Sequence, residues 1–188
     1  MKYISFILLI IFLFHPNYLS ASIKNKIIQN FEKTNNLSFE FKQNINEEIE
    51  RGKRVIEYPK KIFCEYKNFK KKILVSNGKK LVIKNLTNNQ FYIYPLEKTA
   101  FNLILDKEFL IEKMRKNKGE MIDSKYFRFK FLEGDYQINI FFDKVTYDII
   151  GWQNVDIYQN LVITYLFNLQ KNVNIEKNKF RLPSQDYN

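Results

Sequence analysis

The chain has 188 residues, 45% of them hydrophobic, and a formal net charge of +11. This length is enough for one domain with a substantial core. Its single cysteine excludes an intrachain disulfide, and its five glycines form no Gly-rich phosphate loop. The basic charge suits nucleic acid, anionic lipid or an acidic partner protein, or it simply reflects a lysine- and asparagine-rich proteome.

The first 22 residues have the order of a secretory signal peptide. Met1-Lys2 gives a positive start, residues 3–14 form an apolar run, and Ser20-Ala21-Ser22 offers small residues for a signal peptidase. The apolar run is short against the roughly 20 residues that span a bilayer. We therefore expect residues 1–22 to be a cleaved signal peptide and residues 23–188 to be one exported domain, and export argues against a nucleic-acid partner.

Few side chains suited to catalysis remain after that cleavage. The sole histidine, His15, lies in the segment expected to be removed, so a Ser-His-Asp site and a zinc site built from Cys and His are excluded. Acidic residues such as Glu40, Glu57 and Glu65 fall one per strand on expected solvent faces, which does not favour a catalytic carboxylate pair. Cys64 lies in an apolar strand and is expected to be a buried, inert thiol. We predict no enzyme, no metal and no cofactor.

The mature chain begins with a helix and continues as strands. Apolar residues at helical spacing predict an amphipathic helix from Ile23 to about Asn36. Strict alternation over residues 37–45 then predicts a half-buried strand. More strands follow as far as Pro95, and Asn77-Gly78 predicts a tight hairpin turn between two of them.

The pattern changes in the middle of the chain and then returns to strands. Residues 101–114 carry apolar side chains at mostly helical spacing, which predicts one helix or two short ones. Strands are predicted again from Phe127 onward, including segments 149–152 and 155–158, and a short final one over 180–182. The predicted fold is mainly β (α+β), with about ten antiparallel strands in a curled sheet and helices over its apolar side. A sheet of that size encloses more volume than its own side chains fill.

Several segments resemble the periplasmic outer-membrane lipoprotein carriers of the LolA family. They are Tyr58-Pro59-Lys60-Lys61-Ile62-Phe63, the run from Ile73 through Ser76-Asn77-Gly78 to Leu81, Phe141-Phe142-Asp143, Ile150-Gly151-Trp152, Asn172-Val173-Asn174-Ile175 and Phe180-Arg181-Leu182-Pro183. The resemblance spans nearly all of the mature chain. It implies an incomplete β-barrel with a helical lid over an apolar cavity. It also implies a periplasmic protein that takes acylated lipoproteins from an inner-membrane ABC transporter and delivers them to an outer-membrane lipoprotein receptor.

The chain departs from the family pattern at the place that the family resemblance links to lid control. Many members carry an arginine before the strand-ending proline, where this chain has Tyr58. Arg54 lies four residues earlier on the same face of the strand, so Tyr58 and Arg54 are both candidates for lid control. Cys64 stands where an aromatic residue is common in the next strand.

Large apolar side chains on the predicted inner face and lid are the candidates for lipid binding. They are Phe39, Phe41, Ile62, Cys64, Leu81, Ile83, Phe109, Leu110 and Met114. Each is alternatively a tightly packed core residue, because periodicity identifies an apolar face but not an empty space. We expect a monomer. Two other functions stay open: a periplasmic lipid- or lipoprotein-sensing regulatory domain, and a carbohydrate-binding β domain that would use the many tyrosines.

Overall fold

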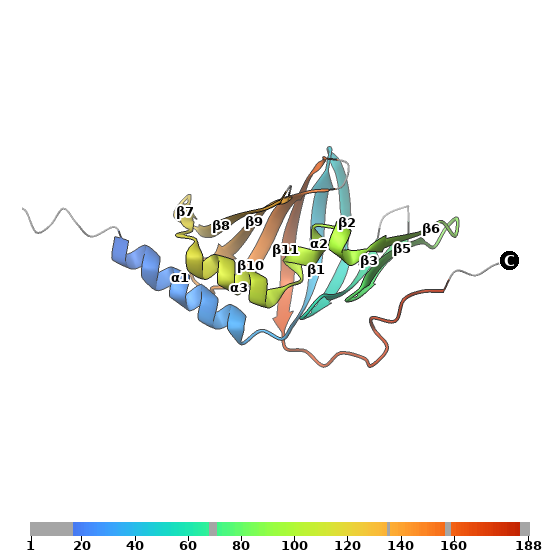
Figure 1. Ribbon diagram of the computed structural model, residues 1–188, viewed down its shortest axis with the longest axis horizontal. Coiled ribbons are helices and arrows are strands. Elements are labelled where there is room, and N and C mark those ends of the chain that lie inside the picture. The colour runs from blue at the N-terminus through green and yellow to red at the C-terminus, as the bar shows by residue number, and fades with distance from the viewer. Residues whose placement is uncertain (1–16, 68–70, 135, 157–158, 185–188) are drawn as a thin grey trace, which may run out of the picture.

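A computed structural model describes residues 17–67, 71–134, 136–156 and 159–184. Its main feature is one antiparallel sheet of eleven strands in the order β6-β5-β4-β3-β2-β1-β11-β10-β9-β8-β7. The sheet curls without closing, and the helices lie across one side of it (Figure 1). The predicted fold class, a mainly β protein with a curled, unclosed sheet and a helical lid, is confirmed.

The helical elements are α1 (Asn17–Glu32), the 3₁₀ turn η2 (Leu96–Lys98), α2 (Phe101–Ile104) and α3 (Lys107–Lys116). The strands of the first half are β1 (Asn36–Ile45), β2 (Glu48–Glu57), β3 (Lys61–Tyr66), β4 (Lys72–Asn77), β5 (Lys80–Asn85) and β6 (Phe91–Pro95). Those of the second half are β7 (Glu120–Ile122), β8 (Tyr126–Glu133), β9 (Tyr136–Asp143), β10 (Ile149–Val155) and β11 (Leu161–Lys171).

The first and last strands of the chain lie together at the centre of the sheet. β1 pairs with β2 along its whole length, and on its other side it pairs with β11, where Phe41 lies opposite Leu166. Two runs of neighbouring strands therefore extend outward from this central pair, one ending at β6 and the other at β7.

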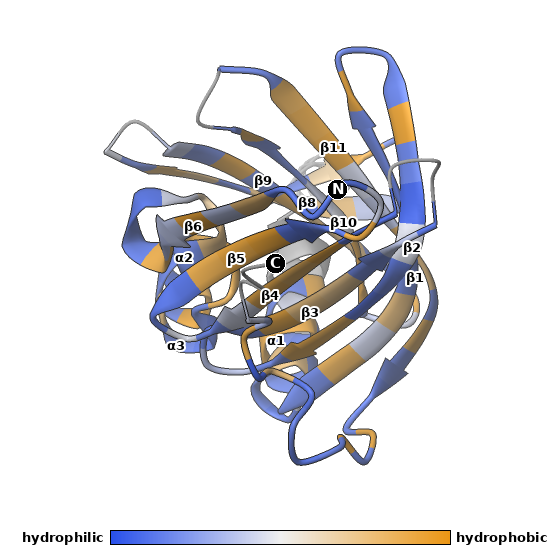
Figure 2. Ribbon diagram, turned by 90° about the vertical axis from the view of Figure 1, so that its right-hand side faces the viewer, coloured by the Kyte–Doolittle hydropathy of each residue, from blue (hydrophilic) through white to orange (hydrophobic). Residues whose placement is uncertain are grey.

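Alternation along the strands separates the two faces of the sheet. On β1 the side chains of Leu37, Phe39 and Phe41 are buried, while those of Glu40 and Lys42 between them are partly exposed. Hydrophobic and hydrophilic bands alternate in the same way along other strands (Figure 2). This period of two places the core on the inner side of the curl.

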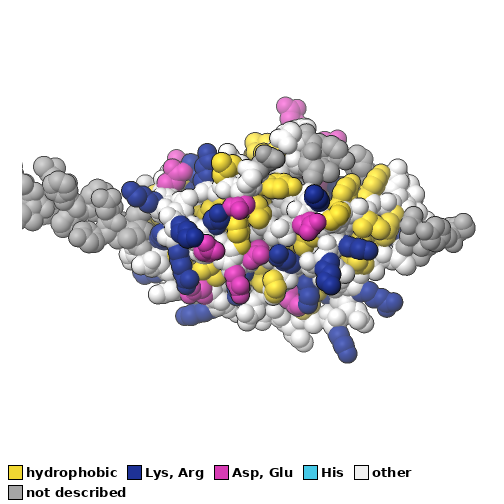
Figure 3. Space-filling view, viewed as in Figure 1, with side chains coloured by type: hydrophobic (Ala, Val, Ile, Leu, Met, Phe, Trp, Pro, Cys, Tyr) yellow, Lys and Arg dark blue, Asp and Glu magenta, His cyan; other side chains and the backbone are white. Residues whose placement is uncertain are grey.

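The helices cover that inner side with their apolar faces. Ile27 and Phe31 of α1 and Leu110 and Met114 of α3 belong to the same buried cluster as the inner residues of the sheet. Charged side chains of both signs are spread over the opposite, solvent-facing surface (Figure 3). This is the arrangement that the helical spacing of the apolar residues predicts.

The two long helices are tied to each other by polar contacts. Lys107 Nζ donates to the carbonyl oxygens of Glu32 and Thr34 at the C-terminal end of α1, at 3.1 Å each. Arg115 of α3 forms an ion pair of 2.6 Å with Glu32, and Lys24 Nζ donates to the carbonyl of Arg115. The N-cap of α3 is Asp106, whose carboxylate accepts a bond from Phe109 N.

The prediction of a final strand over residues 180–182 is wrong. These residues form the end of a turn and a segment without strand pairing, which contacts Lys61 of β3 through Phe180 and Lys84 of β5 through the carbonyl of Ser184. Lys179 Nζ lies 4.3 Å from the centre of the Phe63 ring, and Val75 and Val82, which follow Phe63 across the outer face of the neighbouring strands, are each only 1% exposed. The segment therefore covers a small second apolar layer, which explains its alternating apolar residues.

Other predictions differ from the structure at the ends of elements. The three-residue strand β7 was missed, and the segments predicted over 149–152 and 155–158 are one strand, β10, that ends at Val155, while residues 157–158 lie outside the described residues. Helix α1 begins at Asn17, before the Ile23 start predicted for the mature chain. Residues 1–16 lie outside the described part, so the signal peptide stays a prediction. Among the described residues no helix is long and apolar enough to cross a membrane.

A glycine brings two aromatic rings together across β2. Gly52 pairs with Phe41 on one side and with Tyr66 on the other, and the rings of these two residues meet edge to face at 5.2 Å. A Cβ at Gly52 would collide with the Glu65 carbonyl and lie 2.9 Å from Cε1 of Phe41. Strand β2 must therefore lack a side chain at this position.

Replacing Gly52 with alanine should lower the free energy of unfolding by about 1–3 kcal/mol, because the added methyl group displaces the β3 backbone and the Phe41 ring. Urea denaturation measures this change. Lys53→Ala, at the exposed neighbouring position, is the control and should change stability by about 0.5 kcal/mol or less. Equal stability of the two variants would contradict the close packing across β2.

Candidate ligand-binding site

A cleft with a volume of about 210 Å³ lies between the inner face of the sheet and the segment that leads into α2. It is lined by Gln43, Ile45, Glu50, Tyr66, Lys72, Leu74, Leu81, Ile83, Tyr94, Thr99, Ala100, Phe101, Trp152, Asn154, Asp156 and Val162. Apolar side chains from β4, β5 and α2 face it, so it suits an apolar ligand.

One wall of the cleft belongs to the helical lid, that is, to the helices α1, η2, α2 and α3 that cover the sheet. Thr99, Ala100 and Phe101 come from the segment that joins η2 to α2, whereas Leu81 and Ile83 come from β5 of the sheet. Since the cleft lies between a sheet and a short helical segment, movement of that segment would widen it.

The floor of the cleft is polar. Glu50, 8% exposed, forms an ion pair with Lys72 and accepts a hydrogen bond from Gln43 Nε2 at 3.2 Å. The Oε1 atom of Gln43 accepts from the hydroxyl of Thr164 on β11 at 3.2 Å. The sheet thus brings together polar groups from strands far apart in the sequence, directly beneath the apolar walls.

Arg54 lies next to this floor and is completely buried, with 0% of its surface exposed. Its Nε donates to Cys64 Sγ at 2.9 Å and its Nη2 donates to Gln43 Oε1 at 3.4 Å. The guanidinium carbon lies 4.2 Å from the centre of the Phe41 ring and 5.3 Å from that of Trp152. These rings stabilise the buried cation through their π-faces.

Phe101 of the lid also contacts this cation, at 5.8 Å from its ring centre to the guanidinium carbon. Arg54 is therefore a charged group of the sheet that lies against α2. Burial raises the pKa of the Cys64 thiol beside it, although the adjacent guanidinium opposes the shift. The thiol consequently stays protonated near neutral pH, as expected for an inert cysteine.

The turn between β2 and β3 holds the start of α3. The backbone N–H of Lys60 donates to the carbonyl of Leu105 at 2.9 Å, and Lys60 Nζ lies 3.4 Å from the carboxylate of Asp106. Ser76 Oγ donates to the carbonyl of Lys60 and thereby fixes the turn to β4. These contacts tie the sheet to the junction between α2 and α3.

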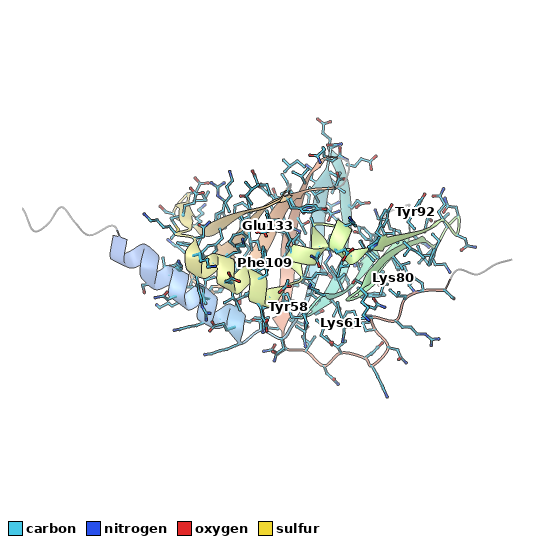
Figure 4. The ribbon with its side chains drawn as sticks, viewed as in Figure 1. Tyr58, Lys61, Lys80, Tyr92, Phe109 and Glu133 are labelled. Carbon is cyan, nitrogen blue, oxygen red and sulfur yellow. The ribbon has the colours of Figure 1, made fainter. Side chains whose placement is uncertain are left out.

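The two predicted lid-control residues occupy different places. Tyr58 is half-buried, and its ring meets Phe31 of α1 edge to face at 5.6 Å (Figure 4). Arg54 instead contacts α2 through Phe101. The structure thus connects each of them to a different helix.

The predicted lipid-binding residues all lie in or against the apolar cluster between sheet and helices. Leu81 and Ile83 line the cleft itself. Phe39, Phe41, Ile62, Cys64, Leu110 and Met114 are buried in the cluster, and Phe109 is half-buried against it. With the lid in this position, most of the inner space is filled by the protein's own side chains.

Sequence reasoning missed the polar floor. Gln43 and Glu50 occupy inward-facing positions in the alternation of β1 and β2, so the sequence pattern predicts two polar side chains on the apolar face. That signal was available in the sequence, but Lys72 and Thr164 become their partners only through strand pairing. No group of three or more His, Cys, Asp or Glu residues that could hold a metal ion occurs in the described part of the chain.

Comparison with known proteins agrees with this architecture. The family profile described as "Outer membrane lipoprotein carrier protein LolA" matches residues 32–183. The chain therefore belongs to the LolA family. A search of curated proteins finds no match.

Solved structures that are similar to the chain share little sequence with it. An uncharacterized conserved protein from Thermus thermophilus has 9% identity and a TM-score of 0.53, with 89% of this chain and 96% of that chain covered. A LolA superfamily protein from Nitrosomonas europaea has 9% identity and a TM-score of 0.46, covering 87% and 97%. A chain of the Pseudomonas aeruginosa MucA/MucB complex has 9% identity and a TM-score of 0.49, covering 87% and 61%.

Asp106 both caps α3 and contacts Lys60, so Asp106→Ala should loosen the lid. Cys64 reports this change, because alkylation requires an exposed thiolate. At pH 8, iodoacetamide should label native Cys64 at least about tenfold more slowly than it labels the urea-unfolded chain, and Asp106→Ala should accelerate native labelling severalfold. Mass spectrometry measures the rates.

Glu108→Ala is the matched control, because Glu108 is exposed in the first turn of the same helix and caps nothing. It should leave the labelling rate unchanged. Native labelling as fast as that of the unfolded chain would contradict the burial of Cys64.

Proposed function

We propose that this protein is a periplasmic carrier that shields the acyl chains of lipoproteins and moves them from an inner-membrane ABC transporter to an outer-membrane receptor. The observation that carries the proposal is the apolar cleft between the curled sheet and the lid of a LolA family member. The proposed carrier performs no reaction of its own and needs no metal or cofactor.

The energetics of acyl chains explain why such a cleft is needed. Each buried CH₂ contributes about 0.8 kcal/mol, so a chain of roughly 15 methylenes is about 12 kcal/mol less stable in water than when buried. Such a chain does not cross an aqueous compartment unaided. A carrier must therefore enclose the chain and also release it.

Enclosure by a separate lid meets both requirements. A cleft of about 210 Å³ is too small for several acyl chains, so loading requires the helices to move away from the sheet. The lid is held by a few polar contacts at its ends and by side-chain packing along its length. In this proposal the acyl chains replace that packing, and the hydrophobic surface of the sheet stays covered throughout the cycle.

A lipid-sensing regulatory domain would use the same cleft for a different purpose. Such a domain would bind acyl chains and change its contact with a partner protein, without passing the ligand on. Transfer of the ligand to an acceptor therefore distinguishes the carrier from the sensor.

A charge placed in the cleft should weaken ligand binding. Ile83→Asp adds a carboxylate among the apolar lining residues, and it should weaken binding of a synthetic triacylated lipopeptide by about tenfold or more. Fluorescence titration with a labelled lipopeptide measures the affinity.

Ile93→Asp is the matched control for this change. Ile93 is 52% exposed on the neighbouring strand β6, opposite Val82 and outside the cleft. This variant should bind the lipopeptide like the unaltered protein. Equal loss in both variants, or in neither, would count against the cleft as the binding site.

Depletion of the protein in its host should cause lipoproteins to accumulate in the inner membrane. Fractionation of the membranes followed by immunoblotting measures the shift, and expression of the unaltered protein should reverse it, whereas Ile83→Asp should not. Normal lipoprotein sorting after depletion would exclude the carrier function and leave the sensor.

A further inference from the structure

The hydrogen-bonding capacity of Arg54 is not fully used. Its Nε and Nη2 atoms have protein partners, but Nη1 is buried and has no hydrogen-bond partner among the described residues. A buried donor without an acceptor is unfavourable, and it is more so when the donor is charged. The fold thus keeps a strong donor unsatisfied in its interior.

The charge of Arg54 is also uncompensated by direct contact with an anion. None of the ion pairs among the described residues includes Arg54, and its neighbours are the neutral side chains of Gln43, Cys64 and Tyr66 and the aromatic rings of the site. Of the two carboxylates that line the cleft, Glu50 is paired with Lys72 and Asp156 accepts hydrogen bonds from Asn160. Buried cations are ordinarily paired with an anion, so a ligand anion would complete this site.

The position of Arg54 makes it accessible from the cleft once the lid moves. Four of its neighbours line the cleft: Gln43, Tyr66, Trp152 and Phe101. The first three of these belong to the sheet, and Phe101 belongs to the lid. Withdrawal of Phe101 therefore removes one side of the cover from the guanidinium while Phe41 and Trp152 hold it in place.

We propose that the cleft binds free long-chain fatty acids, with the carboxylate on Arg54 and the alkyl chain along the apolar wall formed by Leu81 and Ile83. This proposal rests on the proposed function only in that the cleft must accept an acyl chain. It adds a second class of ligand, distinguished from an esterified or amide-linked chain by its anionic end.

The chemistry of the site favours a carboxylate. A guanidinium is a planar fork of donors that matches the two oxygens of a carboxylate, and one such cation neutralises one carboxylate charge. The rings of Phe41 and Trp152 lie over the guanidinium, so an incoming anion must approach the edge of the fork, where N–H groups point.

The test compares two ligands that differ only at their polar end, palmitate and hexadecanol, in competition with a fluorescent acyl probe. The unaltered protein should bind palmitate about tenfold or more tightly than hexadecanol, since a hydrogen-bonded charge pair contributes about that much. In Arg54→Gln the two affinities should become equal, with hexadecanol affinity retained. Arg54→Lys should keep part of the preference, because it retains the charge but not the fork.

The matched control makes the same substitution outside the cleft. Arg51→Gln changes an exposed arginine three residues earlier on β2 that does not line the cleft, and this variant should keep the preference for palmitate. Loss of the preference in Arg51→Gln, or its survival in Arg54→Gln, would overturn the assignment to Arg54.

Failure of the two proposals can be told apart. Equal binding of palmitate and hexadecanol by the unaltered protein would overturn the fatty-acid proposal alone. Binding of neither ligand nor the lipopeptide would overturn the proposed function as well. If Arg54→Gln does not fold, Arg54→Lys decides: hexadecanol binding without any preference for palmitate would overturn the proposal.

Discussion

The need to cover the apolar inner face of a wide, unclosed sheet determines most of this structure. Eleven strands form a curl whose inner residues would be exposed to water without the helices. Hydrophobic burial is non-directional and roughly proportional to area, so any apolar surface of suitable shape can replace the lid. The proposed exchange between a protein helix and an acyl chain rests on this property, because both would bury the same face of the sheet.

A group of polar side chains within this apolar interior would orient a bound ligand. Glu50 accepts a hydrogen bond from Gln43 and forms an ion pair with Lys72. Arg54, next to Phe101, has one buried N–H group, Nη1, without a hydrogen-bond partner among the described residues. An apolar surface alone would accept a chain in either orientation. A single buried cation fixes which end of a ligand lies deepest, and its contact with the lid relates the position of the helix to what occupies the cleft.

The strands and helices were predictable from the sequence because alternation and helical spacing report local faces. Residues 37–45 and 101–114 show this clearly, and Asn77-Gly78 marked a hairpin. The strand predicted over 180–182 was wrong because alternation also fits an extended segment that packs on a sheet face without pairing. The floor of the site was missed because its partners, such as Gln43 and Thr164, are 121 residues apart and meet only through strand pairing.

The central pairing of β1 with β11 has a consequence for the order of folding. These strands come from opposite ends of the domain, so the middle of the sheet forms through contacts of very long sequence separation, and such topologies fold slowly. Until residues 161–171 have been synthesised, β1 lacks one neighbour and the two halves of the sheet cannot join. The central pair of the sheet therefore forms only after both β1 and β11 are present.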